Sequence, residues 1–531
     1  MKDRTENRIA ALVLLLYSVA TRTIASIHSI LFNKDVIDCD AACFVVIGRE
    51  ILKGKVLYKD IFDHKTPYIY LIHGLASLID FNHLGLFLVE VVVLFVTLYF
   101  IYKILLIIFE NAKFHDTIKL SGSELRVISL IGAFIMGVAL SNYNITEGYY
   151  RTEPFVVSLV LPAVYLLAKY YYGKTKILII SKHMFIIGLL AGLTFMINIK
   201  GIVLFVPLVI PLAFDFIKQK QWFGLLKTFC LGLFGVIIAI LPYVIYMIVT
   251  DSVKDMIFAV WDTNLAYAND YMVYEASSQA VVKTISTKDG IVTLIIAFMM
   301  KYPYIMTLIT LAIAILFVLN NNKQFKIALC LQIIILFLMT FSVGRPHAYY
   351  LYTFLPYLIV IYILLVKVFV NRCGICFNGV KMKLNGVLII VISILLSLGI
   401  NYSRNNNSVK KMELLCIQDA EELRDVVKKY DPNYNKLKIL AFGFLPEVYL
   451  WLDADIHYKY FVRPFMSYNA YRFGIDEQVK YINKVDPDIF CIRNFDLVPR
   501  ELEMKVLFTL NYYYDMIGEC REFYVYGKKR Q

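Results

Sequence analysis

The feature that most constrains the fold is a succession of continuous apolar runs that recur along most of the chain. Each run is about 17 to 25 residues long, which is the length that an α-helix needs to cross a membrane. The strands of a membrane β-barrel would alternate in polarity over about 10 residues. The runs therefore predict about eleven membrane-spanning helices, near residues 9–31, 84–109, 127–142, 153–171, 184–199, 202–217, 225–249, 303–319, 327–343, 348–369 and 386–401.

The composition supports this interpretation. Of the 531 residues, 59% are hydrophobic and 18% are charged, and the mean hydropathy is +0.65, which is too apolar for a soluble protein of this size. The 39 Tyr and 37 Phe are spread within and beside the apolar runs, which argues against a disordered or collagen-like chain. We therefore expect an α-helical polytopic membrane protein.

The formal net charge of +13 does not form one basic patch, because basic and acidic residues alternate from loop to loop. Lys and Arg occur in short groups in every second loop, whereas the intervening loops carry the acids. Because cytoplasmic loops are rich in Lys and Arg, the pattern predicts a cytoplasmic N-terminus and disfavours nucleic acid as a partner. The first run could be a signal peptide, but its length favours a retained anchor. An odd number of spans then places the C-terminal segment outside.

From about residue 402 the chain becomes a mixture of polar and apolar residues. Alternating segments at 436–442 and 522–527 are typical of strands, and 412–429 is typical of a helix. We therefore predict two domains, a transmembrane domain over 1–401 and an extracytoplasmic soluble α/β domain over 402–531.

Polar residues are densest in the first outer loop, residues 32–83. Asp38 and Asp40 stand at the start of a segment that continues as an amphipathic helix and ends near Gly54, too short and too charged to span. We expect this helix to lie on the membrane surface. Two carboxylates at the mouth of a span could include a general base. They could also simply cap the helix, because Asp is a favoured N-cap residue, and spacing alone favours capping.

The rest of this loop carries the motif Gly54-x-x-x-Tyr58-x-Asp60 followed by His64-Lys65-Thr66-Pro67. Together with Asp38 and Asp40, it resembles the GT-C class of integral-membrane glycosyltransferases. The likeness is to the branch of the protein O-mannosyltransferases, the aminoarabinose transferases of lipid A and the RgtA/B/C/D-like enzymes. Ala41 stands where that family often has Glu, and Thr66 replaces a proline. The resemblance implies the GT-C fold and makes Asp40 the catalytic carboxylate, with Tyr58, Asp60, His64 and Lys65 as further site candidates.

The second outer loop ends in Thr152-Glu153-Pro154, which is similar to the family's second-loop acid. By analogy Glu153 would lie beside Asp40 and, with Asp38, position the acceptor, the sugar or an optional divalent metal ion. Without the resemblance, an interfacial Glu exposed to water is the simpler interpretation. No cofactor is certain.

Cationic residues near the outer ends of spans supply the complementary charge. Lys200 resembles the lysine that follows the family's fifth span, and Arg345 and His347 lie in a segment similar to its aromatic-rich last outer loop. These three residues would bind the donor phosphate, where charge accumulates as the glycosidic bond breaks. The alternative is that they extend toward lipid headgroups. Tyr58, Tyr68 and Tyr349 could present sugar-facing surfaces, although an interfacial aromatic belt is the default.

The resemblance implies an inverting glycosyltransferase. It would move a sugar from a polyprenyl-phosphate donor to a hydroxyl of a glycan, glycolipid or protein acceptor, at the outer face of the cytoplasmic membrane and among its lipids. A surface-polysaccharide polymerase or flippase, or a secondary transporter, remains the alternative. Glu90 is the clear acid within a span, and Arg22, inside the first span, should face the bundle or an outer cavity because lipid exposure of a charge is costly.

Overall fold

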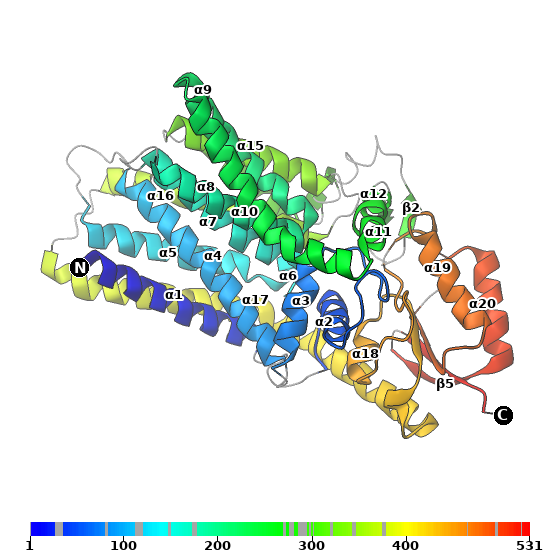
Figure 1. Cartoon of the computed structure of the whole chain (residues 1–531). Coiled ribbons are helices and arrows are strands. Elements are labelled where there is room, and N and C mark those ends of the chain that lie inside the picture. Colours follow the sequence, from blue (N-terminus) through cyan, green and yellow to red (C-terminus); the bar gives the residue numbers. More distant parts are fainter. Residues whose placement is uncertain are drawn as a thin grey trace.

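The computed structural model describes residues 2–26, 35–79, 83–111, 120–146, 150–172, 178–268, 272–274, 281–284, 295–296, 299–300, 302–318, 322–341, 347–373, 379–464, 466–493, 498–521 and 523–530. A bundle of long helices forms one end of the molecule, and a small sheet with short helices forms the other (Figure 1). Eight helices in the described part are long and apolar enough to cross a membrane, and three apolar helices are shorter. The chain is thus a helical, multi-pass membrane protein. The count of eleven spans stays a prediction.

The helices of the bundle follow the apolar runs. They are α1 (Lys2–Ser26), α4 (Leu84–Glu110), α5 (Gly122–Leu140), α7 (Thr152–Tyr172), α8 (Leu178–Ile197), α9 (Val206–Lys218), α10 (Trp222–Val249), α14 (Pro303–Val318), α15 (Lys323–Phe341), α16 (Ile359–Cys373) and the first part of α17 (Gly379–Tyr430). The core of the bundle is a single cluster of buried apolar side chains. Within it, α4 contacts α1, α5 and α7.

Two spans begin with 3₁₀ segments, η1 (Ile199–Phe205) and η3 (Ala348–Leu358). The break before η1 falls at Asn198, whose backbone is extended and whose side chain accepts a hydrogen bond from the amide of Lys200. The sequence placed the junction of two runs at this point, and the structure confirms it. Because Pro207 lacks an amide proton, the carbonyl of Leu204 has no i+3 donor.

Short elements cover the end of the bundle that faces the C-terminal sheet (Figure 1). They are α2 (Cys39–Leu52), α3 (Tyr68–Ser77), α6 (Tyr143–Thr146), α11 (Val253–Met256), the π-helical η2 (Ile257–Asp262), α12 (Thr263–Ala268) and the antiparallel pair β1 (Met272–Tyr274) and β2 (Val281–Thr284). The predicted first-loop helix is confirmed as α2. It is more deeply covered than a surface helix, because α3 and α18 pack against it.

Close packing of α2 on α3 depends on glycine. A Cβ atom on Gly48 would lie 2.4 Å from the carbonyl oxygen of Tyr70, and one on Gly74 would lie 2.8 Å from the backbone of Gly48. The two backbones therefore touch, as in small-residue helix contacts within membranes. This contact sets the position of α2 and of the two acids at its N-terminus.

The C-terminal region contains η4 (Tyr434–Lys436), β3 (Ile439–Phe442), α18 (Glu447–Trp451), α19 (Tyr468–Asn483), β4 (Ile489–Ile492), α20 (Arg500–Tyr513), β5 (Tyr514–Cys520) and β6 (Phe523–Lys528). The sheet order is β3-β4-β6-β5, with β3 and β4 parallel and the other pairs antiparallel. The predicted strands at 436–442 and 522–527 are confirmed as β3 and β6.

The helix α17 joins the two ends of the molecule. It lies along α1 and α5 and continues to the C-terminal sheet, where it contacts β5 and β6 (Figure 1). It runs unbroken through residues 401 and 402, so the division into two domains at that point stays a prediction. Arg424 of α17 makes two hydrogen bonds to the carboxylate of Asp35, at 2.7 and 2.6 Å. The C-terminal region is thereby bound to the first outer loop.

Candidate active site

Two carboxylates lie at the N-terminus of α2. Asp38 is the N-cap, and its side chain accepts a hydrogen bond of 3.2 Å from the amide of Asp40 in the first turn. The capping interpretation is therefore right for Asp38. Asp40 does not cap the helix, and its side chain is directed to a different group, the guanidinium of Arg151.

Arg151 is the residue that links the two acids. Its Nη1 is hydrogen-bonded to Oδ2 of Asp40, and its Nη2 lies 3.4 Å from Oδ1 of Asp38. Burial raises the pKa of Asp38 to about 6, against the opposing effect of Arg151 and with a further contribution from Asp40. Burial lowers the pKa of Arg151, but the two carboxylates outweigh it and raise that pKa well above its ordinary value. A charged guanidinium thus holds the pair.

A second carboxylate, Asp63, organises the segment that carries His64 and Lys65. It accepts hydrogen bonds from the Tyr70 hydroxyl and from the amide of His64, both at 2.7 Å. The Nδ1 of His64 lies 3.0 Å from the same carboxylate. Burial would raise the pKa of Asp63, but His64 and Tyr70 together lower it to about 2. Asp63 is consequently an anionic anchor for this turn.

Two tyrosines hold the backbone of Lys65. The Tyr58 hydroxyl donates to its carbonyl at 2.7 Å, and the Tyr70 hydroxyl accepts from its amide at 3.3 Å. Tyr58 is fully buried and has a left-handed backbone with φ of 68°. It therefore supports the Lys65 backbone from within the core and presents no surface to a sugar. Asp60 is exposed in the adjacent turn, where it accepts a hydrogen bond from the amide of Val56.

A polar pocket lies between the loop that carries His64 and Lys65 and the ends of several bundle helices. Its lining combines two lysines, a buried carboxylate and several hydroxyl or amide groups. The polar lining residues are His64, Lys65, Thr66, Glu153, Asn198, Lys200, Asn264, Tyr267, Thr340, Tyr350 and Thr353. Burial lowers the pKa of Lys65, but Asp40 and Glu153 outweigh it and raise that pKa. Lys65 therefore lines the polar pocket and is near enough to Asp40 for that carboxylate to raise its pKa.

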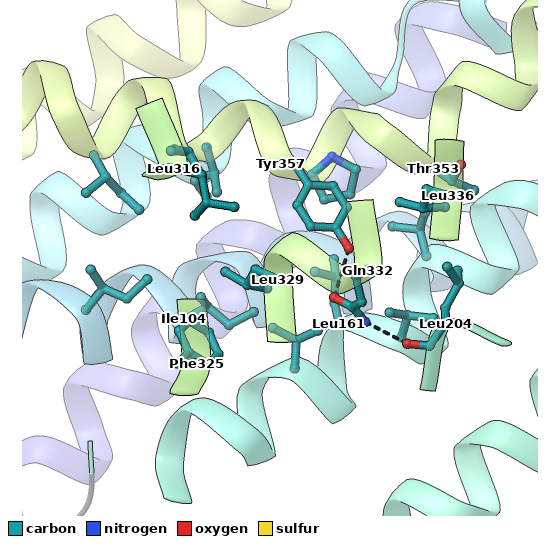
Figure 2. A pocket seen from close by; sticks show the side chains of 18 of the residues that line it. Ile104, Leu161, Leu204, Leu316, Phe325, Leu329, Gln332, Leu336, Thr353 and Tyr357 are labelled. Atoms are coloured by element: carbon teal, nitrogen blue, oxygen red, sulfur yellow. Dashed lines mark hydrogen bonds between the residues drawn. The ribbon is translucent and has the colours of Figure 1, made fainter. Parts of the chain in front are cut away.

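The two 3₁₀ segments both line this pocket and are connected through Gln332 of α15. The Nε2 of Gln332 donates to the carbonyl of Leu204 in η1 at 2.8 Å, and its Oε1 accepts from the Tyr357 hydroxyl of η3 at 2.8 Å (Figure 2). Gln332 is fully buried. It supplies the donor that Leu204 lacks within η1.

An apolar cavity extends from the polar pocket into the bundle. The two share Val156, Leu204, Leu336 and Thr353 as lining residues. Figure 2 shows the cavity lined by aliphatic side chains, with Gln332 and Tyr357 as polar groups on its wall. It reaches Ile104 and Ile108 of α4, toward the opposite end of that helix from the polar pocket.

The predicted residues thus fall into three sets. His64, Lys65, Glu153 and Lys200 meet in the polar pocket, and Asp38 and Asp40 meet at Arg151. His347 precedes η3 and does not line the pocket. Its ring stacks on the ring of Tyr349, with 5.0 Å between the two centroids. Tyr58 and Asp60 lie outside it. Arg345 falls outside the described residues.

Sequence reasoning missed Arg151, Asp63 and the pocket residues from α12. Arg151 immediately precedes the second-loop motif Thr152-Glu153-Pro154, so its proximity to that motif was an available signal. Asn264 and Tyr267 of α12 belong to no sequence motif that would have identified them. Asn264 donates to the carbonyl of His64 at 2.7 Å, a contact made by residues 200 positions apart.

The paired acids do not fit a divalent metal ion. The positively charged guanidinium of Arg151 already occupies the position between Asp38 and Asp40. Within the part of the chain that the structure describes, no three His, Cys, Asp or Glu side chains converge as a metal site would require.

No protein-family model and no curated protein matches the chain. Among solved structures, ArnT from Cupriavidus metallidurans bound to undecaprenyl phosphate superposes with a TM-score of 0.55 at 11% identity, over 99% of this chain and 98% of that one. The apo state of the same protein matches with a TM-score of 0.54, again at 11% identity, over 98% of each chain. The chain has the GT-C fold. This likeness extends over the helix bundle and the C-terminal region alike, which confirms the predicted fold class.

Proposed function

We propose that the chain is an inverting glycosyltransferase that moves a sugar from a polyprenyl-phosphate donor to an acceptor hydroxyl. The observation that carries the proposal is the polar pocket that Lys65 lines together with Glu153 and Lys200, with Asp40 near enough to Lys65 to raise its pKa. A carboxylate that could take a proton and cations that could bind a phosphate are thereby brought to one place.

The polar pocket suits the phosphate of the donor. Lys65 and Lys200 would bind its oxygens by charge-assisted hydrogen bonds. The apolar cavity that continues from this pocket (Figure 2) would take the first isoprene units of the lipid. A ligand with an anionic head and an apolar chain matches both parts, and undecaprenyl phosphate, which is bound in the ArnT structure, is such a ligand.

In the proposed reaction the acceptor oxygen attacks the anomeric carbon from the face opposite the phosphate. The bond between that carbon and the phosphate oxygen breaks, and its electron pair stays on the phosphate, next to Lys65 and Lys200. The hydroxyl proton passes to the carboxylate of Asp40. Arg151 holds Asp40 in place through Oδ2, so we assign Oδ1 to the acceptor. Glu153 would orient the sugar or the acceptor.

The charge pattern of the loops supports an outward-facing site in the cytoplasmic membrane, with a cytoplasmic N-terminus. The C-terminal region would then be extracytoplasmic and would contribute to binding of the acceptor, which is a glycan, a glycolipid or a protein.

The test is transfer of radiolabelled sugar from a panel of polyprenyl-phosphate sugars to membrane extracts. We expect transfer by the wild type, loss of transfer by Asp40→Asn, and full transfer by Asp251→Asn, which changes an exposed outer-loop acid with a positive φ of 50° that Asn tolerates. Wild-type transfer by Asp40→Asn would refute the mechanism. Absence of transfer by the wild type from every donor would favour the polymerase or transporter alternatives.

A further inference from the structure

Two charged residues form a pair inside the bundle, away from the polar pocket. The Nη2 of Arg22 in α1 lies 3.1 Å from Oε2 of Glu90 in α4, and both side chains are 2% exposed. Removing two charges from water is costly, and hydrophobic residues of similar volume often serve as well for stability. Charged residues that occur within membrane spans usually serve a function of the protein other than stability.

The carboxylate of Glu90 has a second partner. Its Oε1 accepts a hydrogen bond of 3.1 Å from the amide of Tyr150. Tyr150 has a left-handed backbone with φ of 75°, which is strained for a non-glycine residue. One oxygen of Glu90 thus holds Arg22, and the other fixes a strained residue in the second outer loop.

Tyr150 immediately precedes Arg151, the residue that holds Asp40 and Asp38. The side chain of Tyr150 is buried in a small apolar cluster that includes Ala41 and Ala42 from the first turns of α2. Tyr150 is therefore bound to Glu90 through its backbone amide and belongs, through its side chain, to the cluster at the acid-bearing end of α2. A change at Glu90 would move the backbone from which Arg151 projects.

We propose that Arg22 and Glu90 are positioning residues for transfer, which act by fixing Tyr150 and hence the guanidinium of Arg151 over Asp40. The inference rests on the proposed function. Arg22 orients the Glu90 carboxylate, Glu90 binds the Tyr150 amide, and Tyr150 directs Arg151. We call this series of contacts the relay. Neither Arg22 nor Glu90 touches the substrates.

Two double variants separate this role from a general structural one. Both R22L/E90L and R22Q/E90Q remove the buried charges, but only the glutamine of E90Q keeps a side-chain carbonyl oxygen to accept the Tyr150 amide. We expect R22L/E90L to lower kcat about 10- to 100-fold with little change in donor KM, because misplacement of a catalytic group acts on the chemical step. We expect R22Q/E90Q to retain most of the activity. Transfer by R22L/E90L at the wild-type rate, or an equal loss in both folded variants, would overturn the proposal.

A mutant cycle with Arg151 provides the second readout. In an Arg151→Met background, R22L/E90L should have little further effect on kcat, because the pair acts through Arg151. If R22L/E90L lowers kcat by the same factor in the Arg151→Met background as in the wild type, the pair acts independently of Arg151, and the relay is overturned.

If R22L/E90L does not fold, Glu90→Asp replaces it. Aspartate keeps the charge for Arg22 but is too short to hold both partners, so the same fall in kcat is expected, and wild-type activity would overturn the relay. A wild type without transfer from any donor would refute the proposed function and the relay together, whereas an active wild type with an active R22L/E90L refutes the relay alone.

Discussion

The guanidinium of Arg151 lies over the ring of Tyr349, 4.3 Å from its centroid, while its nitrogens contact Asp38 and Asp40. Arg151 is therefore held on one side by an aromatic face and on the other by two carboxylates. The planar, forked shape of arginine suits both contacts at once, whereas the compact ammonium of lysine cannot stack flat on a ring while it bridges two carboxylates.

Substitution of Arg151 by Lys should preserve the charge and impair the reaction. We expect kcat to fall about 10- to 100-fold, because Asp40 loses its fixed orientation. The matched control is Arg126→Lys, which alters an arginine paired with Glu6 near the start of α1 and should transfer as the wild type does. Steady-state kinetics on purified protein measures both, and equal activity of Arg151→Lys and wild type would contradict the assignment.

Removal of the Lys200 charge should weaken donor binding. Because a charge-assisted hydrogen bond contributes about 1.5 to 3 kcal/mol, Lys200→Met should raise the donor KM about tenfold or more, with Lys200→Arg intermediate. Lys182→Met changes an exposed lysine of α8 and serves as the control. A donor KM in Lys200→Met equal to that of the control would remove Lys200 from the phosphate site.

The bridge through Gln332 should matter for stability and for the donor site. Gln332→Leu keeps the volume but leaves the Leu204 carbonyl and the Tyr357 hydroxyl without this partner, so we expect a loss of about 1 to 2 kcal/mol in unfolding free energy. The donor KM should rise, because η1 carries Lys200. Gln324→Leu is the control, since Gln324 lies in the first turn of α15, away from this bridge, and contacts Asp215. A stability loss with unchanged KM would confine Gln332 to a purely structural role.

The buried carboxylate of Asp63 should make stability depend on acid pH. Its pKa falls from the ordinary 3.8 to about 2 in the folded protein, so the ionised form stabilises the fold above about pH 4. That contribution, about 2 kcal/mol, is lost as pH falls from about 4 toward 2. Unfolding of the wild type and Asp63→Asn in detergent should therefore differ at neutral pH and converge in acid. A difference that persists unchanged at about pH 2 would contradict this assignment.

Chelation should leave transfer intact, because Arg151 occupies the position between Asp38 and Asp40 that an ion would need. We expect the same rate with and without EDTA, measured on enzyme purified in a chelator. Loss of transfer that is restored by added Mg²⁺ or Mn²⁺ would show that a metal ion takes part after all.

The amino-acid sequence alone predicts the helical membrane class, because a lipid environment requires long apolar helices whose backbone hydrogen bonds are satisfied internally. It also located the junction at Asn198, the helix after Asp38 and the strands β3 and β6, since these depend on local patterns of polarity. The motif in the first loop identified His64 and Lys65 as site candidates, and the likeness of later segments to the same family added Glu153 and Lys200. The structure brings these four together.

Which charged residues meet depends on how distant parts of the chain pack together. The pairing of Arg151 with Asp40 joins residues 111 positions apart, and the pairing of Arg22 with Glu90 joins two helices that no local pattern relates. The buried positions of Tyr58 and Gln332 likewise follow from packing between distant elements. The physical reason is that hydropathy and helix periodicity are properties of neighbouring residues, whereas an ion pair or a buried hydrogen bond depends on how separate helices cross.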